Sequence, residues 1–399
     1  MKNIAICFDG TWNTSDAPDY TNVVKTARLV APVDNKGNPQ VVFYVSGVGS
    51  EQVAFGNSIN NLLGGAFGVG LLNNIEQAYR FLIFNYEPGD RIFVFGFSRG
   101  AFSARAFGGV LRKCGILQRE HVNKIGKAIA LYKNKPLHPD AEECMIFRRD
   151  HSVPAWHSDK EREWRKLNVE NAQNESRLQI EYMGIWDTVG ALGVPAHWLF
   201  AGLFNKKYRF FDDRLSSMVV NGRHALAIDE RRRIYDATPW NNLDELNKER
   251  RVTEDTPIDK RPYVQQWFPG DHGSVGGGGD EVGLSDGALV WVVEGAVALG
   301  LRVDPVKLEE HRGNVNHRAP LHNMKKPAFD ITSYGLRKRR KALWKLEESD
   351  LSEIARKRLD EPPENLPRKK PYLPRPLRAL AKSLAELAKA GREALKKAA

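Results

Sequence analysis

The sequence predicts an α/β fold, a doubly wound and mostly parallel sheet with helices on both faces. Short runs rich in β-branched and aromatic residues, bounded by turn residues, are typical of buried strands. There are five such runs: Asn3–Phe8, Gln40–Ser46, Arg91–Phe97, Leu178–Trp186 and Tyr263–Phe268. Helical patterns lie between them, and strands that alternate with helices favour a parallel sheet.

The connection between the second and third strands shows this unit most clearly. Residues 74–86 carry apolar side chains at helical spacing: Ile75, Ala78, Tyr79, Leu82 and Ile83. Residues 87–90, Glu-Pro-Gly-Asp, then turn the chain into the third strand. A further helix is expected after that strand, over Phe102–Leu111.

Length and composition indicate a globular protein with a large core. Of its 399 residues, 42% are hydrophobic, 27% charged and 10% aromatic, which excludes a disordered or fibrous chain. The three cysteines, Cys7, Cys114 and Cys144, are an odd number without metal-ligand spacing. We therefore expect buried thiols, no disulfide framework, no metal site and no cofactor.

Positive charge is concentrated near the C-terminus. The net charge is +11, and residues 336–399 hold 19 basic and 9 acidic side chains. The rest of the chain is almost neutral, so no basic groove is indicated and no nucleic-acid partner is expected. Residues 336–399 combine a proline-rich stretch with a basic, leucine-bearing helix, which suits an anionic membrane surface. A solvated helix that packs on the body is the alternative.

These features divide the chain into a body, residues 1–330, and a basic, proline-interrupted helical tail, residues 331–399. Within the body, residues 119–176 are polar and helical. We interpret them as an insertion and a candidate cap over a pocket. Residues 193–213 carry several large apolar side chains and are either another cap or an ordinary packed loop.

No segment has the features of a secretion signal or a membrane span. Only Lys2 precedes the first apolar run, and that run stops at Asp9. The longest apolar stretch, residues 287–301, contains Glu294 and is too short to cross a bilayer core of about 30 Å. We expect a cytoplasmic protein, or one that is exported without a cleavable signal peptide.

The strongest local signal is the pentad Gly96–Gly100, with the pattern G-x-S-x-G between a strand and a helix. In that setting the turn presents a serine nucleophile, and the small residues let neighbouring segments approach closely. Ser98 is therefore the candidate nucleophile. The backbone N–H of Arg99, at the start of the helix, faces the position where negative charge develops on an attacked carbonyl.

A serine nucleophile needs a general base and a carboxylate that orients the base. In α/β-hydrolases these follow the serine in the order acid, histidine. Asp187 comes directly after a strand, at the edge where the active-site groups of open α/β sheets collect, and is the candidate acid. His272 follows the last strand in a glycine-rich loop and is the candidate base.

Other residues compete for these two roles. His224 lies in a helix-like stretch, where a structural histidine is the more frequent case, and His197 is a weaker rival. Carboxylates also occur at turns and helix starts for structural reasons. The alternative acids are Asp229, Asp271 and the pair Asp212 and Asp213.

The loop after the first strand offers a second set of oxyanion donors. Because a backbone N–H from such a loop completes the oxyanion hole of α/β-hydrolases, those of Gly10 and Thr11 are candidates, with Asp9 supporting the loop. An aspartyl-phosphate site, D-x-D-G-T, is excluded, since Cys7 stands where the nucleophilic aspartate would be. A plain turn that closes the strand is the alternative.

The glycine-rich segment 64–70 superficially suggests a phosphate site. It lacks the Gly-Lys-Ser/Thr ending of a nucleotide-binding loop. We predict a loop beside the pocket instead.

Taken together, these segments resemble the α/β-hydrolase catalytic domain of the type VI secretion phospholipase effectors, over much of residues 1–330. The matching segments are Phe8–Asn13, Gly47–Gly49, Ala78–Leu82, Gly89–Asp90, Gly96–Ala101, Trp186–Val189, His224–Arg232 and Trp267–His272. The resemblance implies that Ser98, Asp187 and His272 form a triad that hydrolyses ester bonds, with phospholipid acyl chains as substrate. It also implies a secretion or immunity partner.

The leading prediction is thus a serine-dependent carboxylic ester hydrolase of the lipase or phospholipase A type. One alternative is an esterase or thioesterase for small soluble esters. The other is a non-catalytic binding protein on a hydrolase fold that uses its basic tail.

Overall fold

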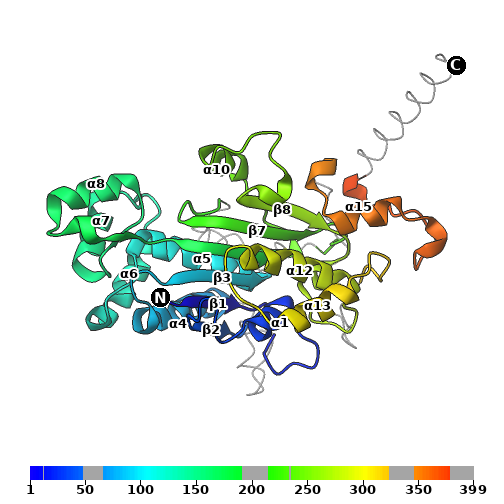
Figure 1. Ribbon diagram of the computed structural model, residues 1–399, viewed down its shortest axis with the longest axis horizontal. Helices are drawn as coiled ribbons and strands as arrows, with labels where there is room; N and C mark the ends of the chain where they lie inside the picture. The colour runs from blue at the N-terminus through cyan, green and yellow to red at the C-terminus, as the bar shows by residue number, and fades with distance from the viewer. Residues whose placement is uncertain (12, 48–65, 191–213, 233–234, 323–345, 378–399) are drawn as a thin grey trace, which may run out of the picture.

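A computed structural model of the chain describes residues 1–399 apart from 12, 48–65, 191–213, 233–234, 323–345 and 378–399. At its centre is a parallel six-stranded sheet with the strand order β2-β1-β3-β6-β7-β8 (Figure 1). The strands are β1 (Asn3–Phe8), β2 (Gln40–Val45), β3 (Arg91–Phe97), β6 (Ile180–Trp186), β7 (Val219–Ala227) and β8 (Tyr263–Phe268). The predicted parallel α/β architecture is confirmed.

The strand β7 is one that the sequence analysis missed. The helix-like environment predicted for His224 is wrong, because this residue lies in β7. The strand pairs with β6 on one side and β8 on the other, and most of its residues are buried. Pairing and burial in the middle of a sheet outweigh the local helix propensity of residues such as Ala225 and Leu226.

The sheet grows in two directions from the pair β1 and β3. From β1 it extends to β2 on one side, and from β3 it extends through β6 and β7 to β8 on the other. In open parallel sheets such a reversal leaves a crevice at the carboxyl ends of the strands. Asp9 follows β1 and Ser98 follows β3, so both residues lie at this crevice.

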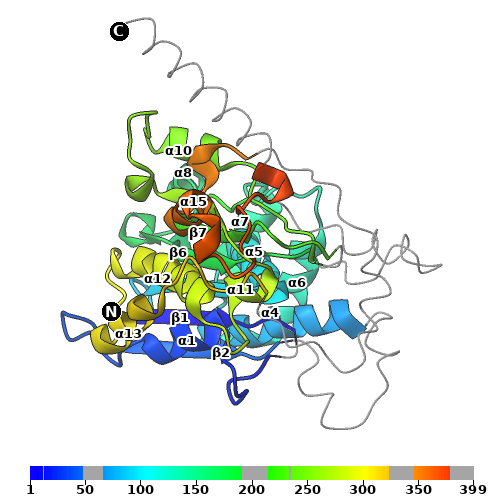
Figure 2. The same cartoon turned by 90° about the vertical axis from the view of Figure 1, so that its right-hand side faces the viewer.

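Helices cover both faces of the sheet (Figure 2). One layer contains α4 (Ala66–Asn85) and α5 (Arg99–Cys114), and the other contains α1 (Asn22–Leu29), α12 (Gly283–Val297) and α13 (Pro305–Asn314). The connection from β7 to β8 holds α10 (Leu243–Glu249) and η4 (Ile258–Lys260), and α11 (His272–Gly276) follows β8.

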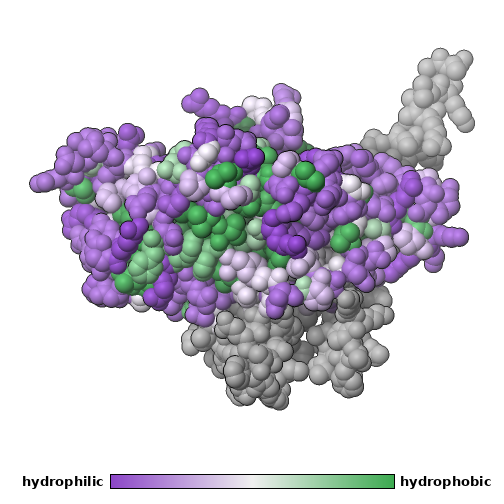
Figure 3. All heavy atoms as spheres, turned by 60° about the horizontal axis from the view of Figure 1, so that its bottom comes forward, coloured by the Kyte–Doolittle hydropathy of each residue, from purple (hydrophilic) through white to green (hydrophobic). Residues whose placement is uncertain are grey.

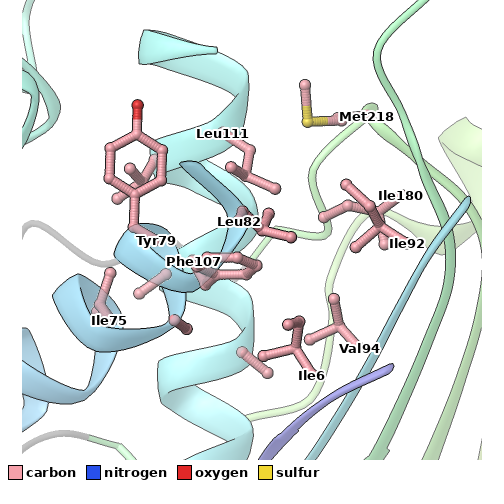
Figure 4. Close-up of a cluster of buried hydrophobic side chains, with 14 of the residues drawn as sticks. Ile6, Ile75, Tyr79, Leu82, Ile92, Val94, Phe107, Leu111, Ile180 and Met218 are labelled. Atoms are coloured by element: carbon pink, nitrogen blue, oxygen red, sulfur yellow. The ribbon is translucent and has the colours of Figure 1, made fainter. Parts of the chain in front are cut away.

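Alternate residues of the strands form the two halves of the core. Ile6, Ile92 and Val94 pack against α4 and α5, as Figure 4 shows. Phe93 and Phe95, which come between them in sequence, belong to the second cluster with residues of α12. This alternation follows from the two-residue period of a strand.

The segment 64–70 is largely helical rather than the predicted loop, because α4 begins at Ala66. Tyr79 and Leu82, further along α4, are buried in the core. Burial of the apolar side chains of α4 stabilises the helix. This contribution exceeds the cost of about 1 kcal/mol for each glycine inside the helix, Gly68 and Gly70.

Residues 119–176 form a helical insertion. Its elements are η1 (Arg119–Lys124), α6 (Ile125–Lys133), α7 (Glu142–His151), β4 (Ala155–Trp156), α8 (Asp159–Asn168), η2 (Ala172–Asn174) and β5 (Ser176–Arg177). The buried Glu161 carboxylate joins its helices, with Arg148 Nε at 2.8 Å and His157 Nδ1 at 2.5 Å. Arg148 also donates to the carbonyl of Lys113 at 2.8 Å. The insertion therefore contacts the end of α5 that is opposite Ser98.

The described part of the tail, residues 346–377, packs beside β8. It contains η5 (Glu348–Asp350), α15 (Glu353–Asp360), η6 (Pro363–Asn365) and η7 (Arg375–Leu377), and it shares a buried cluster with Trp267. The Ser352 N–H donates to the Trp267 carbonyl at 3.0 Å, and the Tyr372 hydroxyl donates to Asp229 at 2.7 Å. This segment covers the last strand of the sheet. The basic cluster 337–341 and the predicted terminal helix lie outside the described residues.

The surface is unevenly apolar. Figure 3 shows hydrophobic residues gathered in the middle of the face that it turns toward the viewer, with hydrophilic residues around them. Among the described residues, no helix is long and apolar enough to cross a membrane, and no group of three or more His, Cys, Asp or Glu side chains is placed to hold a metal ion.

The packing of α5 on β1 requires a glycine at position 100, because a β-carbon there would lie 2.2 Å from the Phe8 carbonyl oxygen. We predict that Gly100→Ala lowers the free energy of unfolding by about 3 kcal/mol, since backbone atoms on both sides must separate. The matched control is Gly126→Ala in α6, where the new β-carbon meets nothing within 4 Å. The control is expected to be neutral or to stabilise by up to about 1 kcal/mol. Urea unfolding measures both changes, and equal stability of the two variants would contradict the prediction.

Candidate active site

Ser98 occupies a sharp turn between β3 and α5. Its backbone has φ 58° and ψ −122°, a conformation that a residue other than glycine rarely adopts. The Ser98 N–H donates to the Trp186 carbonyl at 3.0 Å, which ties the turn to β6. A β-carbon at Gly96 would lie 2.7 Å from both Ala101 Cα and the Gly100 carbonyl oxygen. The glycines of the pentad thus allow the strand and the helix to cross closely.

His272 lies beside Ser98, with its Nε2 at 2.8 Å from Ser98 Oγ, although 174 residues separate them in sequence. It is the first residue of α11, and Asp271 caps this helix by accepting the Ser274 N–H at 3.0 Å. The His272 N–H donates to Glu230 at 3.1 Å. These two contacts fix the backbone that carries the imidazole.

Asp187 completes the hydrogen-bonded series. Its Oδ2 lies 2.6 Å from His272 Nδ1, and its Oδ1 accepts the Ala227 N–H at 3.0 Å. The carboxylate is fully buried, and its backbone φ of 35° is also positive. With one oxygen held by the backbone and the other by Nδ1, the carboxylate orients the ring so that Nε2 faces Ser98. The structure thus brings together the three residues that the sequence analysis selected.

Two aromatic rings that the sequence analysis did not single out flank the imidazole. The ring centroids of Phe97 and Tyr235 lie 4.6 and 4.5 Å from that of His272. The Arg232 guanidinium lies 4.3 Å from the Tyr235 centroid and pairs with Glu230 at 2.6 Å. Glu230 therefore holds both the His272 backbone and the cation that packs on Tyr235. The only sequence signal of Glu230, Arg232 and Tyr235 is their position after β7, and the sequence analysis missed this strand.

His224 does not reach the site. It is fully buried in β7, with Nε2 at 3.0 Å from Thr188 Oγ1 and Nδ1 at 3.1 Å from Gln265 Oε1. Burial, together with the positive charge of Arg105, holds the pKa of His224 well below its ordinary value. This histidine is a neutral structural residue of the sheet.

The alternative carboxylates have other partners. Asp229 accepts the Gly270 N–H at 2.8 Å and the Tyr372 hydroxyl at 2.7 Å, and Asp271 caps α11. His197, Asp212 and Asp213 lie outside the described residues.

The Asp9 carboxylate organises the loop that follows β1. Its Oδ1 accepts the Gly10 N–H at 2.7 Å, and its Oδ2 accepts the hydroxyls of Thr21 at 2.8 Å and Tyr44 at 2.7 Å. A β-carbon at Gly10 would lie 3.3 Å from Ser98 Cβ, so the loop is close to Ser98. The Gly10 N–H thus has Asp9 as its partner in this arrangement.

Thr11 is the next residue of this loop, and its side chain is only 8% exposed. Among the described residues, Thr11 Oγ1 has no hydrogen-bond partner. Buried hydroxyls normally have one. On the other side of Ser98, Arg99 begins α5, and the N–H groups of a first helical turn have no partner within the helix. The site therefore combines two sources of donors near the serine hydroxyl.

A nucleophilic side chain, an imidazole and a carboxylate in a hydrogen-bonded series define the site geometry of serine hydrolases on open α/β sheets. Residues 2–295 match the type VI secretion system family described as phospholipase effector Tle1-like, catalytic domain. Because the match covers most of the chain, the protein belongs to this family.

Three other proteins are similar to parts of this chain. The uncharacterized protein YEL023C of Saccharomyces cerevisiae is 29% identical over 242 residues, which are 58% of this chain and 31% of the yeast protein. An uncharacterized protein from Pseudomonas aeruginosa has a TM-score of 0.38 and 16% identity, over 79% of this chain and 49% of that chain. The Tle1 effector bound to the VgrG spike of the type 6 secretion system also has a TM-score of 0.38, with 19% identity over 71% and 52% of the two chains. The chain thus spans about a third of the yeast relative and about half of each solved chain.

Burial raises the pKa of Asp9 to about 6, against the lowering effect of the hydrogen bonds from Tyr44, Thr21 and Gly10. The unfolded chain loses this proton near the ordinary value of 3.8. Between the two values the folded state binds the proton and the unfolded state does not, so stability falls as pH rises from about 4 to about 6. We predict that Asp9→Asn removes this decrease and is more stable than the unchanged protein above about pH 6, by up to about 3 kcal/mol.

Chemical unfolding from about pH 4 to about pH 8 measures this pH dependence. Asp34→Asn is the control with the opposite sign, because hydrogen bonds from Asn38 lower the pKa of Asp34. That variant is expected to lose stability at neutral pH. A loss of stability in Asp9→Asn at neutral pH would show that the Asp9 charge is favourable, contrary to the prediction.

Proposed function

We propose that this chain is a serine-dependent hydrolase of carboxylic esters that acts on the acyl esters of phospholipids. The observation that carries the proposal is the series Ser98 Oγ to His272 Nε2, 2.8 Å, and His272 Nδ1 to Asp187 Oδ2, 2.6 Å. The description of the family as a phospholipase effector supports a lipid ester as the substrate.

In the proposed reaction, Ser98 Oγ attacks the acyl carbonyl while His272 Nε2 accepts the hydroxyl proton. The Asp187 carboxylate stabilises the imidazolium that forms. The imidazolium then gives its proton to the leaving alcohol, the lysophospholipid, and an acyl group remains on Ser98. Water, deprotonated by His272, attacks this ester. The fatty acid is released as the imidazolium returns the proton to Ser98 Oγ, which restores both residues.

The tetrahedral intermediates carry a negative oxygen that needs donors close to Ser98. We assign one donor to the Arg99 N–H, because Arg99 is the first residue of α5, next to Ser98, and the helix dipole places positive charge at this end of the helix. We assign another to Thr11 Oγ1, which is buried in the loop that approaches Ser98 and has no partner among the described residues. Asp9 acts indirectly, since its carboxylate holds the Gly10 N–H and thereby the loop.

Partners and location follow from the family as further parts of the proposal. The family is described as one of type VI secretion effectors, so we infer that the protein is exported and has a secretion or immunity partner. Residues 336–399, with their excess of basic side chains, are the proposed contact with an anionic membrane surface.

Ser98→Ala removes the nucleophile, and we predict that it lowers ester hydrolysis by at least about a thousandfold. Hydrolysis is measured on phospholipid vesicles and on short-chain soluble esters. The unchanged protein is expected to hydrolyse the phospholipid vesicles faster than the soluble esters. Faster hydrolysis of the soluble esters would favour the small-ester alternative. A fluorophosphonate is expected to label Ser98 in the unchanged protein and not in Ser98→Ala.

Ser103→Ala is the matched control for the nucleophile. Ser103 is buried in α5, one turn beyond Ser98, and its hydroxyl donates to the Arg99 carbonyl at 3.2 Å. This variant is expected to keep its activity. Full hydrolysis by Ser98→Ala would end the proposed mechanism.

Thr11→Val replaces the hydroxyl with a methyl group of similar size. Because the hydroxyl is proposed to bind charge that exists only in the transition state, kcat is expected to fall about a hundredfold with little change in KM. Thr11→Ser keeps the hydroxyl and is expected to recover most of the rate. If Thr11→Val is fully active while Ser98→Ala is inactive, Thr11 is not a donor, and the hydrolase proposal is unaffected.

A further inference from the structure

A second concave site lies along the same helix that carries the nucleophile turn. It is a cavity of about 940 Å³ between α5, the insertion, β6 and α10. Phe102 lies one turn beyond Ser98 at one end, and Lys113 lies in the last turn of α5 at the other. At 1.5 Å per helical residue, Lys113 is about 22 Å along the axis from Ser98.

The charged side chains that line the cavity are mostly basic. The cations are Arg105, Arg112, Lys113, Lys135 and Arg214, and the carboxylates are Glu245 and Glu249. Arg214 and Glu245 pair with each other at 2.6 Å. Five cations and two carboxylates thus line the cavity, so its described walls have an excess of positive charge.

Lys113 is the most informative of these cations, because it is 95% buried in this wall, with a relative exposure of 5%. Its ammonium group donates to the Asn134 carbonyl. In the part of the chain that the structure describes, it forms no ion pair with a carboxylate. A buried ammonium group is unfavourable unless an anion or a full set of acceptors compensates for lost hydration.

Other buried cations of this protein show the usual compensation. Lys25 contacts Asp286 at 2.6 Å, and Arg148, which neighbours Lys113, contacts Glu161 at 2.8 Å. Lys113, by contrast, contacts a backbone carbonyl and borders the cavity. Desolvation accordingly lowers the pKa of Lys113, with weaker opposing effects from Cys144, Cys114 and Glu143.

We propose that this cavity binds the phosphate group of a ligand and that Lys113 supplies the buried positive charge opposite it. Lys135, on the exposed rim, and Arg112 add further positive charge at the same end. A phosphate group carries one to two negative charges and several acceptor oxygens, which matches an excess of several cations better than a single carboxylate does. The distance from Ser98 makes this a site separate from the ester being hydrolysed, so the inference does not depend on the proposed chemistry.

Binding is tested on the full-length protein with Ser98→Ala, so that turnover does not contribute heat. Inorganic pyrophosphate is titrated by calorimetry, and vesicles of phosphatidylglycerol or phosphatidylcholine are tested by co-sedimentation. Lys113→Met and Lys135→Glu are expected to raise the dissociation constant by about tenfold or more. Lys127→Met, an exposed position on α6 outside the lining, is the charge-matched control and is expected to leave binding unchanged.

Two forms of the positive result distinguish the source of the phosphate. Binding of pyrophosphate that depends on Lys113 and Lys135 supports a soluble phosphate ligand. Binding of phosphatidylglycerol vesicles alone, with the same dependence, supports a lipid phosphate at the same site. The proposal is overturned if neither probe binds, or if Lys113→Met and Lys135→Glu bind as tightly as the control. Lys135→Glu keeps the test decisive if Lys113→Met does not fold, because Lys135 is exposed.

Discussion

The hydrogen bond between Asp187 and His272 is the contact on which the site geometry depends. It joins the end of β6 to the start of α11, which follows β8, across the intervening strand β7. Because Asp187 also accepts the Ala227 N–H, its carboxylate is fixed by β7 itself. The position of the imidazole therefore depends on the register of three consecutive parallel strands, and a shift of β7 by one residue would remove this support.

The same network explains how two uncommon backbone conformations persist at one place. Ser98 and Asp187 both have positive φ, and such residues typically cost 1–3 kcal/mol when nothing compensates. The Ser98 N–H donates to the Trp186 carbonyl, and the Asp187 N–H donates to the Ala225 carbonyl at 2.7 Å. These bonds join the turn after β3 to β6 and the turn after β6 to β7. The neighbouring strands therefore stabilise the two turns that carry Ser98 and Asp187.

How much of the site could be predicted depends on how local each signal is. Ser98 has a complete local signature, with glycines, strand and helix all within a few residues. Asp187 and His272 could be found only through the rule that polar residues after parallel strands meet at one edge. Glu230 and Tyr235 follow the same rule, but they could not be selected because β7 has little strand character of its own. Its pairing partners lie more than 35 residues away in sequence, as Ile185 opposite His224 and His224 opposite Gln265 show.

The amino-acid composition of the tail does not distinguish its packed part from its basic part. Its excess of basic residues suggests one solvated segment, yet residues 346–377 bury Leu351, Ala355 and Tyr372 against the β8 side of the sheet. A hydrogen bond from Tyr372 to Asp229 anchors this segment next to the strand that leads to His272. Net charge counts only the ionisable side chains and does not indicate which apolar residues are buried.

The two ends of α5 favour opposite charges. Comparing the dipole contribution with the cost of burying an ammonium group shows how much of the burial of Lys113 the helix explains. At the N-terminus the positive end of the dipole favours the negative oxygen proposed beside Ser98. At the C-terminus the dipole favours the cations Arg112 and Lys113, by roughly 0.3–1 kcal/mol each for exposed groups. Burying an ammonium ion costs several kcal/mol, which exceeds that contribution. The dipole therefore accounts for basic residues in the last turn, but it is too small to account for the burial of Lys113 beside a cavity.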